Sequence, residues 1–228
     1  MAIRLYFVAK PFEGKLFEEL EIEFKYYNGF SITQKQKSII SMHEKIYKKD
    51  PTLQVLEISS KSNNPLGVAL SAFNLKVYDE KIGKEYPLEN IFQSSKVFEL
   101  GGPYRDLLNV SPKDAKKDPR LRESGELIYF DYDNVIWEKE PKTMFYDWLY
   151  INALYRNKYL SKEILKYNAF TDIEFNHEKS FNCQARAAAI FVGLNKIGKI
   201  KEIIDNKDEF KKIYIDKKET NEQLTMNL

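Results

Sequence analysis

YPLENIFQSSKVFE (Tyr86–Glu99) predicts a helix, because a proline suits the first turn and apolar side chains recur at helical spacing. The apolar residues that share its inward face are Leu88, Ile91 and Phe92. A second stripe of residues, four and three positions apart, consists of Glu89, Gln93 and Lys96. A carboxylate, an amide and an ammonium are therefore expected at the edge of an apolar surface, which makes this segment a candidate for chemistry.

The sequence around this segment indicates an α+β fold that is mostly helical, with a small antiparallel sheet near the N-terminus. Strands are expected early, at residues 3–8 and 20–26 with a turn at Gly14, and again at 53–62 and 126–132. Helices are expected at residues 32–49 (capped by Ser31), 140–157, 161–167 and 183–198 (capped by Asn182). Residues 63–67 and 169–182 are expected to be loops. No strand–helix alternation is present, which favours an α+β fold over a doubly wound sheet.

One domain is expected over residues 1–205. It comprises an N-terminal section (1–62) and a core (66–194), and a charged tail follows at 206–228. This tail is expected either to dock as a helix or to fray.

The composition narrows the possible chemistry. With 36 basic and 34 acidic side chains, the net charge of +2 does not favour binding of nucleic acid by overall charge. Local contacts with a DNA backbone are expected instead at Lys35, at Lys37 and in the basic span 113–122, although each is equally consistent with solvated surface charge. Two histidines and one cysteine argue against a zinc site, a disulfide framework and a histidine-activated nucleophile. Carboxylates and lysines are therefore the expected catalysts, without metal or cofactor.

No apolar run is long enough to span a membrane, and the first residues lack the apolar stretch of a signal peptide. The sequence therefore predicts a cytoplasmic protein.

Four polar groups interrupt apolar sequence: Ser71 to Asn74; the stripe Glu89, Gln93 and Lys96; Trp137 with Lys142 and Asp147; and Asp172 with Asn182 and Arg186. Each also has an ordinary structural explanation as a solvated face, a turn or a helix cap. In the last group, free N–H groups in the first turn of a helix together with an arginine favour an anion. Asn182 and Arg186 are therefore predicted to hold phosphate.

These groups resemble, in order and approximate spacing, the motifs of the NADAR family of YbiA-like N-glycosidases. The segments that carry the resemblance are LSAFNL (70–75), YPLENIFQSSKVFE (86–99), IWEKEPKTMFYDWLYINAL (136–154) and AFTDIEFNHEKSFNCQARAAAIFVGL (169–194). The sequence departs from the family pattern in three ways: Asn74 is shifted by one place, Ala185 replaces a glycine, and Phe170–Thr171 replaces a Trp-Gly pair. The chain is most similar to the branch that is paired with DarT-type toxins, which attach ADP-ribose to guanine bases in DNA.

The resemblance implies an antitoxin that removes ADP-ribose from guanine in DNA, with a DarT-type toxin as a possible partner. Glu89 is the expected general acid and base, Lys96 the expected Schiff-base nucleophile, and Asp172 the second carboxylate. The expected substrate-binding residues are Ser71, Phe73, Asn74, Gln93, Trp137, Asn182 and Arg186.

Two other functions remain open at this point. The same pocket could cleave a phosphoribosylamino-pyrimidine of the riboflavin pathway. Alternatively, the protein could neutralise a toxin by binding it without catalysis, and the aromatic tail segment EFKKIYI (209–215) could serve as the contact.

Overall fold

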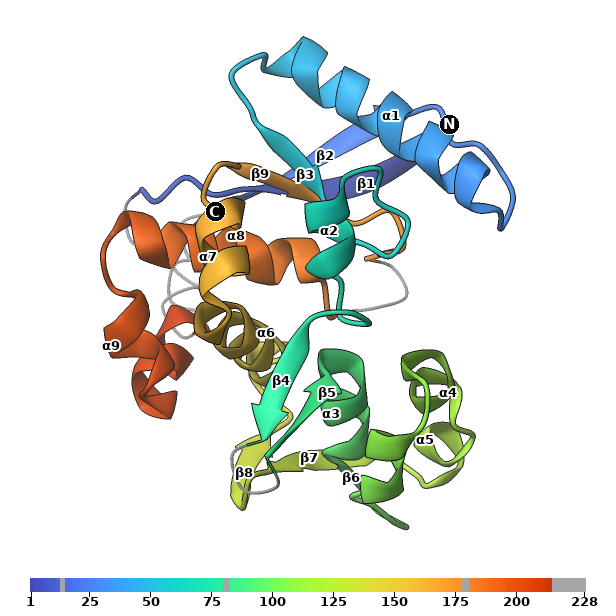
Figure 1. Cartoon of the computed structure of the whole chain (residues 1–228), viewed down its shortest axis with the longest axis vertical. Coiled ribbons are helices and arrows are strands. Elements are labelled where there is room, and N and C mark those ends of the chain that lie inside the picture. Colours follow the sequence, from blue (N-terminus) through green and yellow to red (C-terminus); the bar gives the residue numbers. More distant parts are fainter. Residues whose placement is uncertain (13–14, 80–82, 178–180, 215–228) are drawn as a thin grey trace, which may run out of the picture.

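The structure is a computed structural model that describes residues 1–12, 15–79, 83–177 and 181–214. It has the predicted α+β fold, with one four-stranded sheet and two smaller sheets (Figure 1). Gly14, the expected hairpin turn, lies outside the described residues. No helix in the described ranges is both long and apolar enough to cross a bilayer.

The largest sheet has the strand order β2-β1-β9-β3. Its strands are β1 (Ala2–Val8), β2 (Glu18–Phe24), β3 (Val55–Glu57) and β9 (Ala169–Thr171). The predicted antiparallel pair of β1 and β2 is confirmed, with Leu5 opposite Glu21. The expectation of a loop at residues 169–182 is wrong at its start, because β9 lies inside the sheet between β1 and β3. All three residues of β9 are buried, and so short a strand carries no alternating pattern that would reveal it.

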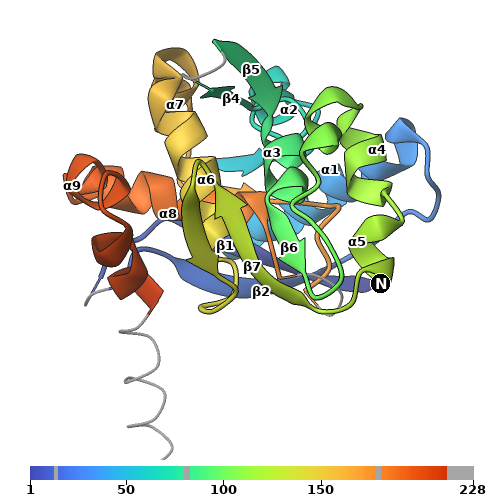
Figure 2. The ribbon, with the colours of Figure 1, turned by 90° about the horizontal axis from the view of Figure 1, so that it is seen from below.

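Helices cover both faces of this sheet (Figures 1 and 2). Helix α1 (Ile32–Lys49) begins at the predicted cap, where Ser31 accepts a hydrogen bond from the Gln34 N–H. Its buried side chains pack with those of one sheet face in a small core that includes Met42 and Ile46. The other face belongs to the main core, where α8 (Gln184–Lys196) contacts β1 and β9.

The second half of the fold is built around helix α3 (Leu88–Ser94). It contains two small antiparallel sheets, β4 (Lys76–Asp79) with β5 (Lys84–Pro87), and β6 (Lys96–Phe98), β7 (Leu127–Tyr132) and β8 (Val135–Glu138). The short helices beside it are η1 (Arg105–Asn109), α4 (Pro112–Lys117) and α5 (Arg120–Glu123). The strand expected at residues 126–132 is confirmed as β7.

Helix α3 (Leu88–Ser94) is shorter than the helix predicted over residues 86–99. Tyr86 belongs to β5, and Lys96 begins β6, where it pairs with Phe130. The Ser95 hydroxyl donates to the Ile91 carbonyl at 2.7 Å as the helix ends, and the residues that follow favour a strand. Every residue of α3 is buried, so its polar stripe is not a solvated face.

A helix, α2 (Pro65–Ala69), stands where a loop was expected. Asn64 caps it by accepting from the Leu66 N–H, and Pro65 occupies the first turn, which is a favourable start that the sequence already contained. Gly67 permits a close approach to β3, because a Cβ there would lie 1.9 Å from the Glu57 carbonyl oxygen. The helix therefore packs directly against the strand that carries Glu57.

The remaining helices are α6 (Met144–Arg156), α7 (Lys158–Ile164) and α9 (Ile200–Ile204). Helix α6 starts four residues later than predicted, after Thr143, and α8 is capped by Cys183 rather than by Asn182. Residues 207–214 are helical, with Phe210 and Tyr214 in the main core. Of the two expectations for the tail, the docked helix describes this part.

Candidate active site

Three segments that are distant in sequence are tied together by one chain of hydrogen bonds. The Glu89 N–H donates to the Ala72 carbonyl at 3.0 Å, and the Ala72 N–H donates to Gln184 Oε1. Gln184 Nε2 then donates to Asp172 Oδ2 at 2.9 Å. The start of α3, the turn after α2 and the segment between β9 and α8 therefore meet, which brings two of the predicted carboxylates to one region.

Two residues of the predicted polar stripe, Glu89 and Gln93, lie on α3 and contact each other. Gln93 Nε2 donates to Glu89 Oε1 at 2.8 Å, and Glu89 is only 4 % exposed. Gln93 Oε1 is buried and has no hydrogen-bonding partner in the part of the chain that the structure describes. A buried acceptor in this state favours a donor supplied by a ligand.

Lys96 stands at the start of β6, with Nζ 4.8 Å from the centroid of the Phe92 ring. The pKa of its amine is lowered to about 8: burial is the main cause, the charge of Glu89 acts in the opposite direction, and the charge of Lys116 adds to the lowering. The charge of Glu89 therefore acts on the Lys96 amine, which is partly uncharged near neutral pH.

Asp172 is 5 % exposed, and burial raises its pKa. Hydrogen bonds from Gln184 and from the Glu174 N–H at 3.0 Å, together with the charge of Lys116, act in the opposite direction. Lys116 interacts electrostatically with both Asp172 and Lys96, so it connects the predicted catalytic groups.

Lys116 comes from α4 and lies over the Phe73 ring, 5.6 Å from its centroid. Lys116 belongs to the basic span that was expected to contact DNA, and its place beside the catalytic candidates was not predicted. The sequence offers only a weak indication that Lys116 faces the protein: Ala115, which directly precedes it on the short helix α4, is buried.

Two tyrosines of α6 complete the buried surroundings. Burial raises the pKa of Tyr146 and Tyr150 well above the ordinary value, and the charge of Asp172 raises both further. The charge of Glu89 also raises the pKa of Tyr146. The Tyr146 ring packs edge-on against Phe92, with ring centroids 5.1 Å apart. Sequence reasoning missed both, although they stand four residues apart on the strongest predicted helix.

The turn at residues 71–74 is held by its own polar side chains. Ser71 Oγ and Asn74 Nδ2 both donate to the Val68 carbonyl, at 2.7 and 2.9 Å. Asn74 Nδ2 also contacts Ser71 Oγ at 3.0 Å. These two predicted binding residues shape the turn, whereas Phe73 lies beside Lys116.

The family assignment rests on one comparison. A model of the family described as DarT1-associated NADAR antitoxin matches residues 2–224. The chain belongs to this family. A search of curated proteins found no match. The resemblance to the toxin-paired branch of NADAR proteins is thus confirmed over nearly the whole chain, including the N-terminal section.

Three predicted binding residues of the antitoxin lie elsewhere. Trp137 is 2 % exposed and packs in the core against Phe145 and Trp148, with ring centroids 5.5 and 4.6 Å apart. Asn182 precedes the cap of α8, and Arg186 is paired with buried Asp147 at 2.5 Å. We therefore assign no part of the chemistry to these three residues.

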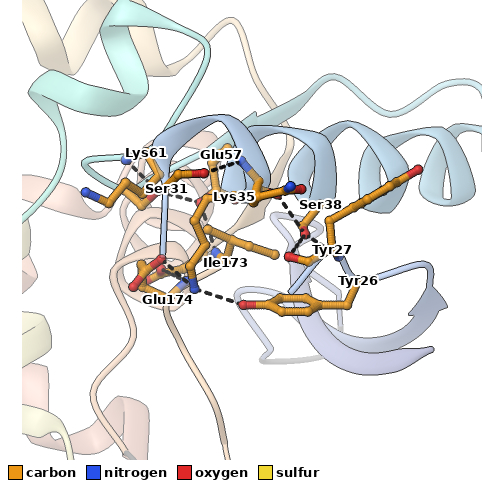
Figure 3. A network of polar contacts seen from close by, with 12 residues as sticks. Tyr26, Tyr27, Ser31, Lys35, Ser38, Glu57, Lys61, Ile173 and Glu174 are labelled. Carbon is orange, nitrogen blue, oxygen red and sulfur yellow. Dashed lines mark hydrogen bonds and ion pairs between the residues drawn. The ribbon is translucent and has the colours of Figure 1, made fainter. Parts of the chain in front are cut away.

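The N-terminal section of the antitoxin holds the segment that carries Asp172 (Figure 3). Lys35 Nζ contacts Glu174 Oε1 at 3.1 Å and donates to the Tyr26 hydroxyl at 2.8 Å. The Ile173 N–H donates to Glu57 Oε1 at 2.9 Å. Lys35 is therefore an anchor for the neighbours of Asp172, and its expected contact with a DNA backbone is not supported by its place in this ion pair.

The basic span at 113–122 is also partly neutralised, because Arg120 contacts Asp106 and Asp118 at 2.6 and 2.9 Å. Among the described residues, no group of three or more His, Cys, Asp or Glu side chains could hold a metal ion.

Proposed function

We propose that the antitoxin hydrolyses the N-glycosidic bond between ADP-ribose and the exocyclic amine of guanine in DNA. The observation that carries this proposal is the half-buried amine of Lys96 over the Phe92 ring, with its pKa lowered to about 8 and the charge of Glu89 acting on it. A lysine is nucleophilic only when uncharged, and a desolvated position beside a second cation is a recognised way to keep it so. Membership of the family of DarT1-associated antitoxins supports the choice of substrate.

In the proposed reaction, Glu89 protonates the ribose ring oxygen, and the ring opens to an iminium between C1 and the guanine nitrogen. The uncharged Lys96 amine adds to C1, a proton passes to the guanine nitrogen, and the C1–N bond to guanine breaks. Water, deprotonated by Glu89, then adds to the Lys96–C1 Schiff base. ADP-ribose leaves as its aldehyde and the lysine amine is restored, so the net change is the addition of one water.

The other groups support this chemistry by position and charge. The Gln93 amide nitrogen donates to Glu89 and orients it. The Gln93 amide oxygen, which has no partner among the described residues, is suited to accept a hydrogen bond from the guanine amine. The Asp172 carboxylate would stabilise positive charge at C1, and Gln184 orients it.

Borohydride trapping tests the proposal most directly. Turnover of a guanine-ADP-ribosylated oligonucleotide in the presence of borohydride is expected to leave ADP-ribose reductively attached to Lys96, detectable by peptide mass spectrometry. Lys84→Arg, at an exposed lysine of β5, is the matched control and should trap as the wild type does. Hydrolysis without any adduct at Lys96 would contradict the covalent step, and absence of hydrolysis would contradict the function.

The rate should also depend on pH through Lys96. With a pKa of about 8, roughly a quarter of the amines are uncharged at pH 7.5, compared with about 0.1 % for an ordinary lysine. The uncharged fraction rises from about 3 % at pH 6.5 to about 50 % at pH 8, so turnover is expected to rise about fifteenfold over this range and to level off above about pH 9. A rate that continued to rise tenfold per unit to pH 10 would show that the amine is not perturbed.

The same assay separates the rival functions. A phosphoribosylamino-pyrimidine, offered side by side, should be a poor substrate. Neutralisation of toxin by Lys96→Ala would instead support binding without catalysis. The tail contact suggested for that alternative is not supported, because Phe210 and Tyr214 are buried in the core.

A further inference from the structure

The side-chain amide of Gln184, the first residue of α8, bridges two segments of the candidate site. Its Oε1 accepts a hydrogen bond from the Ala72 N–H, and its Nε2 donates to Asp172 Oδ2 at 2.9 Å. A backbone N–H can only donate, so the end of the bridge at Ala72 admits only the amide oxygen. The amide is therefore held in one orientation, in which it presents a donor to Asp172.

Both oxygens of the Asp172 carboxyl group accept hydrogen bonds from N–H donors. Oδ1 accepts from the Glu174 N–H at 3.0 Å, and Oδ2 accepts from Gln184. Such donors favour the charged form of a carboxyl group, because a protonated oxygen would point its own hydrogen at a donor. Burial raises the pKa of Asp172 to about 6, and the hydrogen bond from Gln184 is the largest of the effects that lower it. Gln184 thus offsets part of the cost of burying this charge.

The peptide groups of Ala72 carry the bridge on to α3. The Ala72 carbonyl accepts from the Glu89 N–H at 3.0 Å. This N–H lies in the first turn of α3, where it has no acceptor within the helix. Ala72 is buried, so water does not readily replace either of its hydrogen bonds. The start of the helix that carries Glu89 is therefore held by the same residue that holds Gln184.

We propose that Gln184 is a positioning residue of the active site: its amide keeps Asp172 charged and fixes it relative to the start of α3. The proposal deepens the proposed function, and it rests on that function where the charge of Asp172 stabilises the reacting sugar carbon. Three hydrogen bonds in series join the two segments that carry Asp172 and Glu89. Because Gln184 acts through Asp172, its loss is expected to lower kcat more than it raises KM.

Other charged and titratable groups act on Asp172 from the neighbouring elements. The charge of Lys116 on α4 lowers the pKa of Asp172, and the charge of Glu174 raises it. The charge of Asp172 in turn raises the pKa of further groups, which are Glu57 on β3, Tyr146 and Tyr150 on α6, and Cys183 before α8. All these groups are the same in wild type and in a variant of Gln184, so a difference between the two pH profiles reports on the bridge.

Gln184→Met keeps the approximate size of the side chain and removes both hydrogen bonds. Its turnover at pH 8.5 is expected to be about tenfold or more below wild type, through kcat and with KM nearly unchanged. Without the donor the pKa of Asp172 rises, and a rise of about one unit lowers the ratio of variant to wild-type rate about fivefold further between pH 8.5 and pH 6. Near-normal turnover, or the same ratio at both pH values, would overturn the proposal.

Gln184→Glu should show the opposite dependence on pH, without a change in side-chain size. When protonated, the new carboxyl group can accept from the Ala72 N–H and donate to Asp172 Oδ2, as the amide does. Once that proton is lost, two carboxylates face each other at hydrogen-bonding distance and repel. The ratio of variant to wild-type rate is therefore expected to fall as the pH rises from 6 to 8.5. A ratio that stays level or rises would contradict the bridge.

Gln54, an exposed residue just before β3, provides the matched controls. Gln54→Met and Gln54→Glu make the same chemical changes away from Asp172, and both ratios should stay near one from pH 6 to 8.5. If Gln54→Glu showed the pH dependence expected of Gln184→Glu, a charge at the surface would suffice and the positioning role would be refuted.

A titration without substrate separates this proposal from the function on which it rests. Carboxyl ¹³C shifts should show Asp172 titrating at higher pH in Gln184→Met than in wild type, and the Ala72 amide hydrogen should exchange with solvent faster. If wild type does not hydrolyse the modified oligonucleotide but both changes are seen, the proposed function fails and the positioning role stands. If wild type hydrolyses it and Asp172 titrates identically in both proteins, the positioning role fails.

Discussion

Lys96→Ala is expected to abolish removal of ADP-ribose from a guanine-modified oligonucleotide, with turnover at least about 10³-fold below wild type. The variant lacks the proposed nucleophile, the amine whose pKa is lowered to about 8 and on which the charge of Glu89 acts. Glu89→Gln should cost about 10²–10⁴-fold, because the amide can keep the hydrogen bond from Gln93 but cannot transfer a proton. Single-turnover kinetics of base release measure both effects.

Stability measurements must accompany these rates. Removing a buried ammonium relieves a desolvation cost, so Lys96→Ala should unfold at a denaturant concentration equal to or above that of the wild type. Lys84→Ala and Glu85→Gln, both at exposed positions of β5, provide surface controls with the same charge changes. Near-normal turnover in either active-site variant would remove that residue from the mechanism, whatever the stability.

The local parts of the fold were predictable from the sequence. The cap at Ser31, the alternation in β2 and the i,i+4 pair of Glu89 and Gln93 each depend on residues close in the chain, and the structure confirms them. The three-residue strand β9 was not predictable, because its place between β1 and β3 is decided by partners more than 100 residues away.

In the candidate site, too, the residues close together in the chain were predictable, whereas those joined by tertiary contacts were not. Glu89 and Lys96 were found because they share one segment, whereas Lys116, Glu57 and Gln184 join the site only through tertiary contacts. Gln184 begins helix α8, directly before Ala185. The same helix carries Arg186, which was predicted to bind phosphate. From spacing alone, an arginine that binds a ligand cannot be distinguished from one that pairs with a buried aspartate.

Arg186→Met is expected to destabilise the antitoxin by about 3–5 kcal/mol, because it leaves a buried carboxylate without its cation. Asp147 is fully buried, and its Oδ2 lies 2.5 Å from the Arg186 guanidinium. The same oxygen accepts from Thr143 Oγ1 at 3.0 Å and from the Tyr214 hydroxyl at 2.7 Å. The ion pair therefore joins α6, α8 and the helical residues 207–214, and urea unfolding followed by circular dichroism would measure its loss.

A double variant distinguishes an uncompensated charge from lost packing. Arg186→Met combined with Asp147→Leu removes both charges, and replacement of a buried ion pair by apolar residues of similar size is often neutral. The double variant should therefore recover most of the stability that the single variant loses. A phosphate-binding arginine would give the opposite pattern: Arg186→Met would unfold like the wild type but raise the KM for the ADP-ribosylated oligonucleotide. Because the guanidinium already satisfies a buried carboxylate, we expect the stability effect and an unchanged KM in the folded double variant.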